Sequence, residues 1–414
     1  MKKRHNDIAL PVAEMSVLKE LEELLLASSS LKGGESFPIY LKDQMDRTYH
    51  DIDLLIENDT VVALSIRYCA LTALPISIDQ LTSLRELDLT GNRLMTLPDS
   101  LGNLLCLQKL YLNDNQLTTI PETLSQLTNL ETLHVYGNRL MALPDSLGQL
   151  TNLKDISLGH NRLTALPASF WRLVNLQVLN LAENQLVFLP ETIGNLAALH
   201  TLDLGHNALT SLPESLAALT NLTFFLYLSD NRLTSLPRSL FENLSKLRYL
   251  NVTDNHLTTL PESVGNLTSL IELRLYNNQL TTLPESMGNL TRLKELHIMN
   301  NLFVSLPEAI GELEQLKELR MSNNRLTSLP TSLGKLRRLT ILDLRNNQLT
   351  TLPASLRNLD NLTSLDLRAN RFVSLPSSVG ELAKLEKLDL RWNKIFPSPE
   401  SLQQLEQRGC VIYI

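Results

Sequence analysis

Residues 260–283 read LPESVGNLTSLIELRLYNNQLTTL, and the same arrangement of leucines, proline and asparagine recurs through most of the 414-residue chain. Its asparagine, Asn278, stands 23 residues from Asn255 on one side and from Asn301 on the other. Two intervals, on either side of Asn231, are 24 residues long. A fixed period in this range is typical of a solenoid, in which successive coils stack along one direction. We call the repeat position of Asn278 the asparagine slot. The residues that occupy it are Cys69, Asn92, Asn115, Asn138, Asn161, Asn184, Asn207, Asn231, Asn255, Asn278, Asn301, Asn324, Asn347, Asn370 and Asn393.

The leucine spacing within each repeat predicts a short strand. In Leu273-Arg274-Leu275 the two leucines should point inward and Arg274 outward. Parallel strands from 15 successive units would stack about 4.8 Å apart in one sheet. The asparagine amide has a hydrogen-bond donor and an acceptor. It can therefore pair with backbone N–H and C=O groups that are shielded from water where the chain turns. We therefore expect a buried asparagine ladder, with the small Cys69 in the first unit.

A Leu-Pro pair recurs from Leu74-Pro75 to Leu375-Pro376, is lost in the last unit, and predicts a helical turn on the opposite face. Proline presets φ and lacks an N–H, which suits the first residue of a helix. Glutamate or serine often comes next, as Glu285 and Ser286 follow Pro284, and both residue types favour a helix start. We expect an α/β horseshoe solenoid with a parallel concave β-sheet and short helices or 3₁₀ turns on its convex face.

The two ends of the array differ from the repeats and indicate caps. Residues 12–28 have apolar side chains at helical spacing, and residues 52–56 and 61–66 resemble two strands around a turn. We expect a capping helix and the start of a hairpin in residues 1–60, the repeat array in 61–396, and a capping helix with an edge strand in 397–414. The alternative for the first helix is that it recruits a partner on its own.

Composition and motifs exclude several classes of protein. The net charge of −7 is not the concentrated positive charge that nucleic-acid or membrane-surface binding requires. We find no signal peptide, no apolar run long enough to span a membrane, and no paired cysteines, so we expect a cytoplasmic protein. Phosphate-binding, zinc-protease and nucleophile motifs are lacking, so we expect no catalysis, no cofactor and no metal site.

The outward strand positions are informative because the repeat does not dictate them. Large amphipathic side chains gather in the middle of the array, and such residues are enriched in interface cores. One of Phe224 and Phe225 must be an inserted residue. The alternative to a binding role is that one of them fills the core. The residues that we expect to bind a partner are Tyr111, His134, Tyr136, Phe225, Tyr227, Tyr249, Arg274, Tyr276, His297, Met299, Arg320 and Trp392.

A second candidate surface lies near the C-terminus. There Asp343, Asp366 and Asp389 alternate with Arg345, Arg368 and Arg391 on successive strands. These opposite charges can neutralise each other, or the arginines can donate to a polar partner. The sequence leaves open whether the mid-array aromatic side chains or these charged rows bind the partner.

The pattern LPESxGNLTxLxxLxLxxNxLTxLP resembles the 23-residue intracellular leucine-rich repeats of the Ras-binding scaffold family, its plant relatives and many bacterial proteins. The resemblance covers about residues 61–396 and consists of structural positions. It implies a monomeric, non-catalytic scaffold or adaptor in intracellular signal transduction, with a small GTPase or another signalling protein as partner. The alternative is a secreted bacterial-type effector that engages host proteins.

Overall fold

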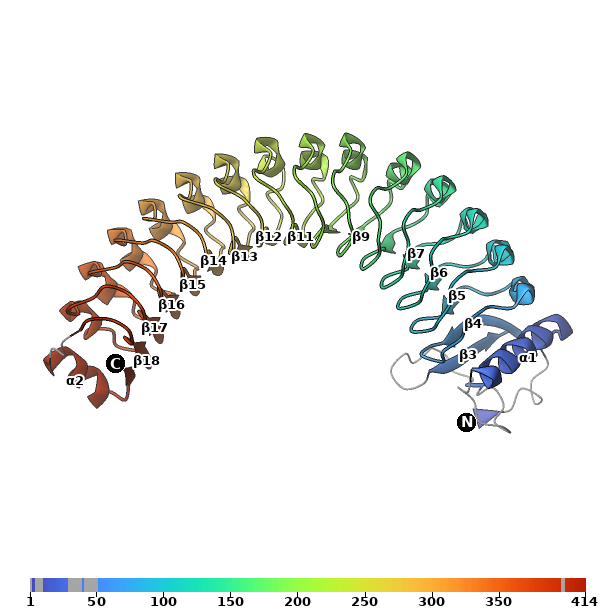
Figure 1. Ribbon diagram of the computed structural model, residues 1–414, viewed down its shortest axis with the longest axis horizontal. Coiled ribbons are helices and arrows are strands. Elements are labelled where there is room, and N and C mark those ends of the chain that lie inside the picture. The colour runs from blue at the N-terminus through green and yellow to red at the C-terminus, as the bar shows by residue number, and fades with distance from the viewer. Residues whose placement is uncertain (1, 4–9, 29–38, 41–50, 396–398) are drawn as a thin grey trace. The chain divides into compact units, whose positions relative to one another are not determined.

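The computed structural model describes residues 2–3, 10–28, 39–40, 51–395 and 399–414. The chain divides into two compact units: Met1–Val187 with Asn195–Leu202, and Phe188–Gly194 with Asp203–Ile414. In each unit short strands line one side of the stacked coils and 3₁₀ helices line the other (Figure 1). The structure therefore confirms a solenoid with a largely parallel sheet and 3₁₀ turns opposite it.

The first unit pairs its strands in parallel from β4 to β9, and each strand leucine faces its counterpart in the next coil, as Leu87 faces Leu110. A two-residue antiparallel pair, β1 with β2, also belongs to this unit. Its strands are β1 (Lys2–Lys3), β2 (Ile39–Tyr40), β3 (Ile52–Glu57), β4 (Thr60–Ile66), β5 (Glu86–Asp88), β6 (Lys109–Tyr111), β7 (Thr132–His134), β8 (Asp155–Ser157) and β9 (Val178–Asn180).

The second unit repeats this arrangement from β11 to β19. The strand β10 (Thr201–Asp203) and the 3₁₀ helix η7 (Glu191–Asn195) contain residues of both units. The strands of the second unit are β11 (Phe225–Tyr227), β12 (Tyr249–Asn251), β13 (Glu272–Arg274), β14 (Glu295–His297), β15 (Glu318–Arg320), β16 (Ile341–Asp343), β17 (Ser364–Asp366), β18 (Lys387–Asp389) and β19 (Val411–Tyr413).

Each Leu-Pro pair leads into a 3₁₀ helix, because the extended proline sets the chain at the N-cap, as Pro284 does with φ −68° and ψ 150°. The remaining 3₁₀ helices are η2 (Ile76–Gln80), η3 (Asp99–Asn103), η4 (Glu122–Gln126), η5 (Asp145–Gln149), η6 (Ala168–Arg172), η8 (Glu214–Ala218), η9 (Arg238–Phe241), η10 (Glu262–Asn266), η11 (Glu285–Asn289), η12 (Glu308–Glu312), η13 (Thr331–Lys335), η14 (Ala354–Asn358) and η15 (Ser377–Val379).

The asparagine slot joins successive coils through hydrogen bonds. Asn92 donates from Nδ2 to the carbonyl oxygens of Ile66 and Leu89, at 2.7 and 2.9 Å. Its Oδ1 accepts from the backbone N–H groups of Cys69 and Leu71, at 3.2 and 3.0 Å. One amide thus satisfies backbone groups of its own coil and of the preceding one, where the leucine core excludes water.

The N-terminal coil is covered by the helix α1 (Val12–Ala27) and the hairpin of β3 and β4. Leu18, Leu21 and Leu25 of α1 are buried, and Glu14 accepts a hydrogen bond from the N–H of Val61 at 2.9 Å. The structure confirms the cap of a helix and a hairpin. The alternative of an independent recruiting helix is wrong, because the apolar face of α1 is covered.

The extra residue of the coil around β11 is neither Phe224 nor Phe225, contrary to our expectation. Phe225 pairs with Tyr249 in ordinary strand register. The Phe224 carbonyl accepts from the N–H of Tyr249, as the Arg248 carbonyl accepts from Glu272 one coil later. Thr223 is therefore the additional residue, between Leu222 and Phe224. Both phenylalanines are about two-fifths exposed, so neither fills the core.

At the C-terminus, α2 (Pro399–Gln407) precedes β19, which pairs in parallel with β18. Leu402, Leu405 and Cys410 are buried there. The expected boundary near residues 396–397 lies outside the described residues. None of the described helices has the length and apolar character needed to cross a membrane.

Candidate functional site

The strand face presents side chains that alternate with the core leucines. In β13, Leu273 is fully buried, whereas Glu272 and Arg274 on either side of it are half-buried and point away from the core. Successive side chains of a strand point to opposite faces, so these positions form continuous rows across neighbouring coils. A partner lying on the strand face would contact these rows.

The aromatic patch of the second unit comprises Phe224, Phe225, Tyr227, Tyr249 and Arg274. The rings of Tyr227 and Tyr249 have centroids 5.0 Å apart, and Phe225 lies 5.6 Å from each of them. Phe224 extends the group, 6.4 Å from Phe225. The Arg274 guanidinium lies 5.6 Å from the centre of the Tyr249 ring. The Arg248 guanidinium lies 6.0 Å from the centre of the Phe224 ring. The patch thus combines four adjoining rings with two cations beside them.

The polar groups of the aromatic patch are largely neutral. Burial raises the pKa of Tyr249 to about 12, even though the nearby charge of Arg274 acts in the opposite direction. Burial and the charge of Asp203 raise the pKa of Tyr227. Arg274 itself forms an ion pair with Glu272. The patch therefore offers hydroxyl donors and apolar rings, and the charge of its Arg274 is already compensated.

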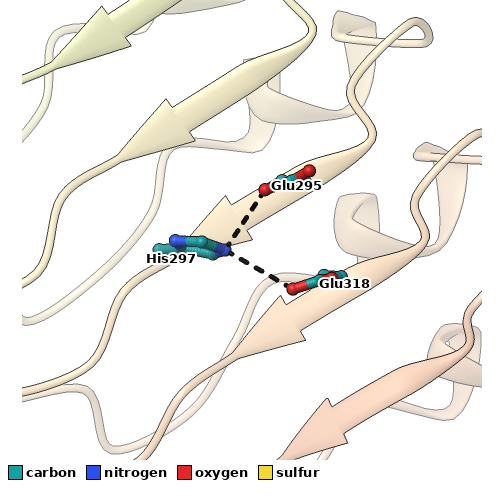
Figure 2. A group of neighbouring side chains, drawn as sticks. All are labelled: Glu295, His297 and Glu318. Carbon is teal, nitrogen blue, oxygen red and sulfur yellow. Dashed lines mark ion pairs between the residues drawn. The ribbon is translucent and has the colours of Figure 1, made fainter.

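His297 on β14 lies between two glutamates (Figure 2). Its Nε2 is 3.7 Å from Oε2 of Glu295 on the same strand and 3.9 Å from Oε2 of Glu318 on β15. Burial, followed by the charges of Arg274 and Arg320, lowers the pKa of His297, so its imidazole is neutral at neutral pH. One donor atom from each of the three side chains lies within 4.8 Å of the others, which could hold a metal ion.

Other expected residues of the second unit are more dispersed. Arg320 donates from Nε and Nη2 to Oε2 of Glu318, at 3.0 and 2.9 Å. Tyr276 and Met299 are half-buried on the strand face, just beyond the third strand residue of their coils. Neither belongs to the ring contacts of the aromatic patch, so the structure gathers only part of the expected set.

In the first unit, Tyr111 and His134 meet edge to face, with ring centroids 5.2 Å apart. His134 lies 3.1 Å from Asp155 on the next strand. Tyr136 stacks on His160 at 5.7 Å and donates its hydroxyl proton to Glu183 at 2.9 Å. These tyrosines and histidines are thus engaged with polar neighbours, and Tyr111 and Tyr136 are half-buried, whereas Phe224 and Phe225 of the aromatic patch are exposed.

The charged rows near the C-terminus pair mainly within each strand. Arg368 donates from Nε to Oδ1 of Asp366 at 2.9 Å, and Arg391 from Nη2 to Oδ2 of Asp389 at 2.6 Å. Burial alone would raise the pKa of Asp389, but the hydrogen bonds from Arg391 and the charge of Arg368 outweigh it and lower that pKa. These rows therefore compensate their own charge.

Arg345 is less firmly held, 3.5 Å from Asp343. A cavity of about 520 Å³ lies beside it, lined by Asn323, Arg345, Asn346, Arg368, Ala369 and Trp392. Trp392 is 72% exposed and adopts a left-handed backbone with φ 62°. The Arg391 guanidinium lies 5.6 Å from its ring centre and 5.2 Å from that of Tyr413.

Sequence reasoning missed Glu183, Glu295, Glu318 and Tyr413 as members of these groups. Glu295 and Glu318 occupy the first strand position, two residues before the row that we examined. Their signal is the repetition of glutamate at this position in three successive coils, beginning at Glu272. Tyr413 could be found only through the parallel pairing of β19 with β18.

The family comparisons match leucine-rich repeats along most of the array. A model described as a leucine-rich repeat region matches residues 63–165 and 235–343. A second, described as Leucine Rich Repeat, matches residues 175–196, 198–219, 338–359 and 384–405. The comparison with curated proteins gave no match.

Solved structures extend the similarity. A leucine-rich repeat protein of Leptospira interrogans is 38% identical with a TM-score of 0.72, over 83% of this chain and 82% of that one. The plant peptide hormone receptor RGFR1, solved in complex with RGF2, is 32% identical with a TM-score of 0.67, over 80% of this chain and 59% of the receptor chain. The Drosophila Toll–Spatzle complex is 25% identical with a TM-score of 0.73, over 82% of this chain and 48% of that one.

Proposed function

Because the chain belongs to the leucine-rich repeat proteins, we propose that it is a non-catalytic scaffold or adaptor that recognises a protein partner on its strand face. The observation that carries this proposal is the aromatic patch. It presents Phe224 and Phe225, 42% and 40% exposed, beside two half-buried tyrosines. Contiguous exposed apolar side chains of this kind mark contact surfaces on soluble proteins.

The repeat does not explain these aromatic side chains. The position of Phe225 varies between coils: it is charged in Lys109, Glu272 and Glu318, and apolar in Val178 and Ile341. A charged residue there would leave the strand leucines equally buried, so aromatic rings add nothing that the core requires. Tyrosine and arginine are also among the residues that contribute most to binding energy in interfaces.

The chemistry of the aromatic patch indicates what the partner presents. Arg274 is compensated by Glu272, and the exposed Arg248 beside Phe224 is a single positive charge, not the concentrated positive face that binds a nucleic-acid backbone. Flat rings with hydroxyl groups suit apolar side chains and backbone carbonyls of a polypeptide. The partner that fits is a folded protein or a peptide segment with exposed apolar residues.

Two of the similar structures support a polypeptide partner. RGFR1 is solved with RGF2, and Toll is solved with Spatzle. The present chain spans less than two thirds of either of these chains, so their particular ligands are not transferred. The resemblance of the repeats to intracellular scaffolds adds the finer proposal of a cytoplasmic signalling role as a monomer, with a small GTPase or another signalling protein as partner.

A second candidate function is that of a secreted effector that engages host proteins. The observation in its favour is the 38% identity to a protein of the bacterium Leptospira interrogans. Fractionating a culture of the source organism into cells and medium separates the two functions. Detection in the cell fraction supports the signalling scaffold, and accumulation in the medium supports the effector.

Site-specific crosslinking tests the proposed binding surface. A photoreactive phenylalanine analogue replaces Tyr227 on the strand face, and in a control protein it replaces the exposed Glu285 on η11. We expect a discrete crosslinked protein from position 227 that is lost when Tyr249→Ala is added. Equal crosslinking from both positions, or crosslinking that Tyr249→Ala leaves unchanged, would place binding elsewhere.

A further inference from the structure

Three side chains with metal-binding atoms converge on the strand face of the second unit (Figure 2). Glu295 and His297 belong to β14 and Glu318 to β15, and one donor atom of each lies within 4.8 Å of the other two. We propose that Glu295, His297 and Glu318 bind a divalent transition-metal ion of the zinc class. This proposal does not depend on the function proposed above.

The fold itself brings these side chains together. Glu295 and His297 are two residues apart on one strand, so they point to the same face. The register of β14 and β15 sets Glu295 directly opposite Glu318. Neighbouring strands lie about 4.8 Å apart, so the three side chains share one small region of the sheet without any distortion of the backbone.

The Nε2 atom of His297 is the central donor. The His297 side chain is only 12% exposed, and Nε2 is buried without a hydrogen-bond partner among the described residues. A buried polar atom without a partner destabilises the folded state. Both glutamate oxygens face this atom from ion-pair distances, so a cation between them would satisfy all three groups.

The charges around the site leave room for a cation. Glu272, Glu295 and Glu318 form a row on three neighbouring strands. Arg274 pairs with Glu272 and Arg320 pairs with Glu318. Glu295 forms no ion pair with an arginine or a lysine in the described part of the chain, where its ion-pair contact is with His297. The row therefore holds three carboxylates against two guanidinium groups.

The donor set selects the class of metal. One imidazole nitrogen with two carboxylate oxygens suits zinc and related ions, whereas magnesium and calcium prefer oxygen alone. Ligands of tetrahedral zinc lie about 3.4 Å apart, slightly closer than the 3.7 and 3.9 Å observed here. The three ligand atoms lie within 4.8 Å of one another, so the glutamates must rotate toward the imidazole to form a tetrahedral site. Glu295 has the freedom for this rotation, since 39% of its side chain is exposed.

Arg320 acts as a positioning residue for this site. Both of its donor atoms bind Oε2 of Glu318, the same oxygen that lies 3.9 Å from Nε2 of His297, so Arg320 holds this carboxylate beside the imidazole. Such outer hydrogen bonds fix the orientation of a ligating carboxylate. Three protein ligands leave at least one position of a tetrahedral ion open to water or to a group from a partner.

Other histidines on the strand face lack this arrangement. His134 lies 3.1 Å from Asp155 and His206 lies 2.8 Å from Asp230. Each of these histidines has one carboxylate at ion-pair distance rather than two. His134 therefore provides a matched control, with a half-buried imidazole on the same face and an incomplete set of ligands.

Calorimetric titration of the full, tag-free chain with zinc chloride tests the proposal. The protein is first stripped with a chelator, and all variants contain Cys106→Ser because that exposed thiol could bind zinc. We expect one equivalent to bind to the parent. Loss of a group that only hydrogen-bonds to a metal ligand typically weakens metal binding by roughly 10- to 100-fold. His297→Gln and Glu295→Gln each remove a ligand itself, so each should weaken zinc binding by at least this factor. His134→Gln should bind zinc like the parent.

Cobalt provides a second measurement on the same proteins. Cobalt(II) in a site with nitrogen and oxygen ligands should give visible absorption bands that change when His297→Gln is introduced. The proposal is overturned if the parent binds no zinc, or if folded His297→Gln and Glu295→Gln proteins bind it as tightly as the parent. Circular dichroism of each variant establishes that it is folded.

Discussion

The side-chain nitrogen of Asn255 donates to the carbonyl oxygen of Leu228, one coil earlier in the stack, at 2.9 Å. Its Oδ1 accepts from the N–H of Leu233 at 3.0 Å. Asn255→Ala would leave the N–H of Leu233 without its partner in a dry environment and would remove one of two hydrogen bonds to the Leu228 carbonyl, which also accepts from Asn231 at 3.2 Å. We expect the free energy of unfolding to fall by about 1–3 kcal/mol, measured by urea denaturation.

His256→Ala serves as the control for that experiment. His256 follows Asn255 in the same coil, but its side chain is exposed, so its loss should change stability by less than about 0.5 kcal/mol. Equal denaturation midpoints for the parent and Asn255→Ala would refute the stabilising role of this asparagine.

Removing tyrosines from the aromatic patch should weaken partner binding and leave the fold intact. Tyr227 and Tyr249 are half-buried on the strand face and make ring contacts with each other and with Phe225. For Tyr227→Ala and Tyr249→Ala we expect the binding free energy to weaken by about 2 kcal/mol or more, which raises the Kd roughly thirtyfold. Titration with the partner that the crosslinking experiment identifies measures this change. Tyr276→Ala should have a smaller effect, because Tyr276 lies outside these ring contacts.

Charge reversal near the C-terminus tests the competing surface. Arg345→Glu changes the least firmly paired arginine of the charged rows and alters the cavity beside Trp392. We expect partner binding to stay within about twofold of the parent, a difference of less than 0.5 kcal/mol. Loss of binding here, together with full binding by the tyrosine variants, would transfer the binding site to this surface.

Glu14 should make the N-terminal cap sensitive to pH. It is 2% exposed, and burial raises its pKa from the ordinary value of 4.5, although the bond from Val61 N–H opposes the shift. The folded state therefore holds the proton more tightly than the unfolded state. Ionisation of Glu14 costs no stability below pH 4.5, and the cost becomes complete above the raised folded pKa.

Glu14→Gln removes this ionisation and keeps an oxygen that can accept from Val61. Relative to the parent, its Tm should rise as the pH increases from below 4.5 through the raised folded pKa of Glu14. Glu23→Gln, on the exposed face of the same helix, is the matched control and should show no such trend. A constant difference in Tm across this range would contradict the argument.

Packing of α1 on the first coil should depend on Leu21. This leucine is fully buried, so Leu21→Ala should destabilise the cap by about 2–5 kcal/mol. Leu26→Ala, at a position 41% exposed on the same helix, should have a much smaller effect. Hydrogen exchange of the amides in α1 and β4 measures the change locally, and equal exchange in both variants would argue against a packed cap.

The repeating pattern by itself determined the fold of each coil. Leucines two residues apart define the strand, proline sets the start of the 3₁₀ helix, and asparagine satisfies the turn between coils, as Leu273, Pro284 and Asn278 do. These are local requirements, repeated with the same residue types, so their outcome follows from the sequence. The capping helix is also predictable, because an exposed coil end needs an apolar cover.

The side-chain groups on the strand face were decided by the tertiary structure. Strand register between residues 20 or more positions apart decides three features. It identifies Thr223 as the extra residue of its coil, places Phe225 beside Tyr249, and brings Glu318 close to His297. The residue pattern predicted that Tyr227 and Arg274 point outward, but it did not specify their neighbours. Parallel stacking brings first and third strand positions of separate coils into contact, and that contact exists only once the solenoid has formed.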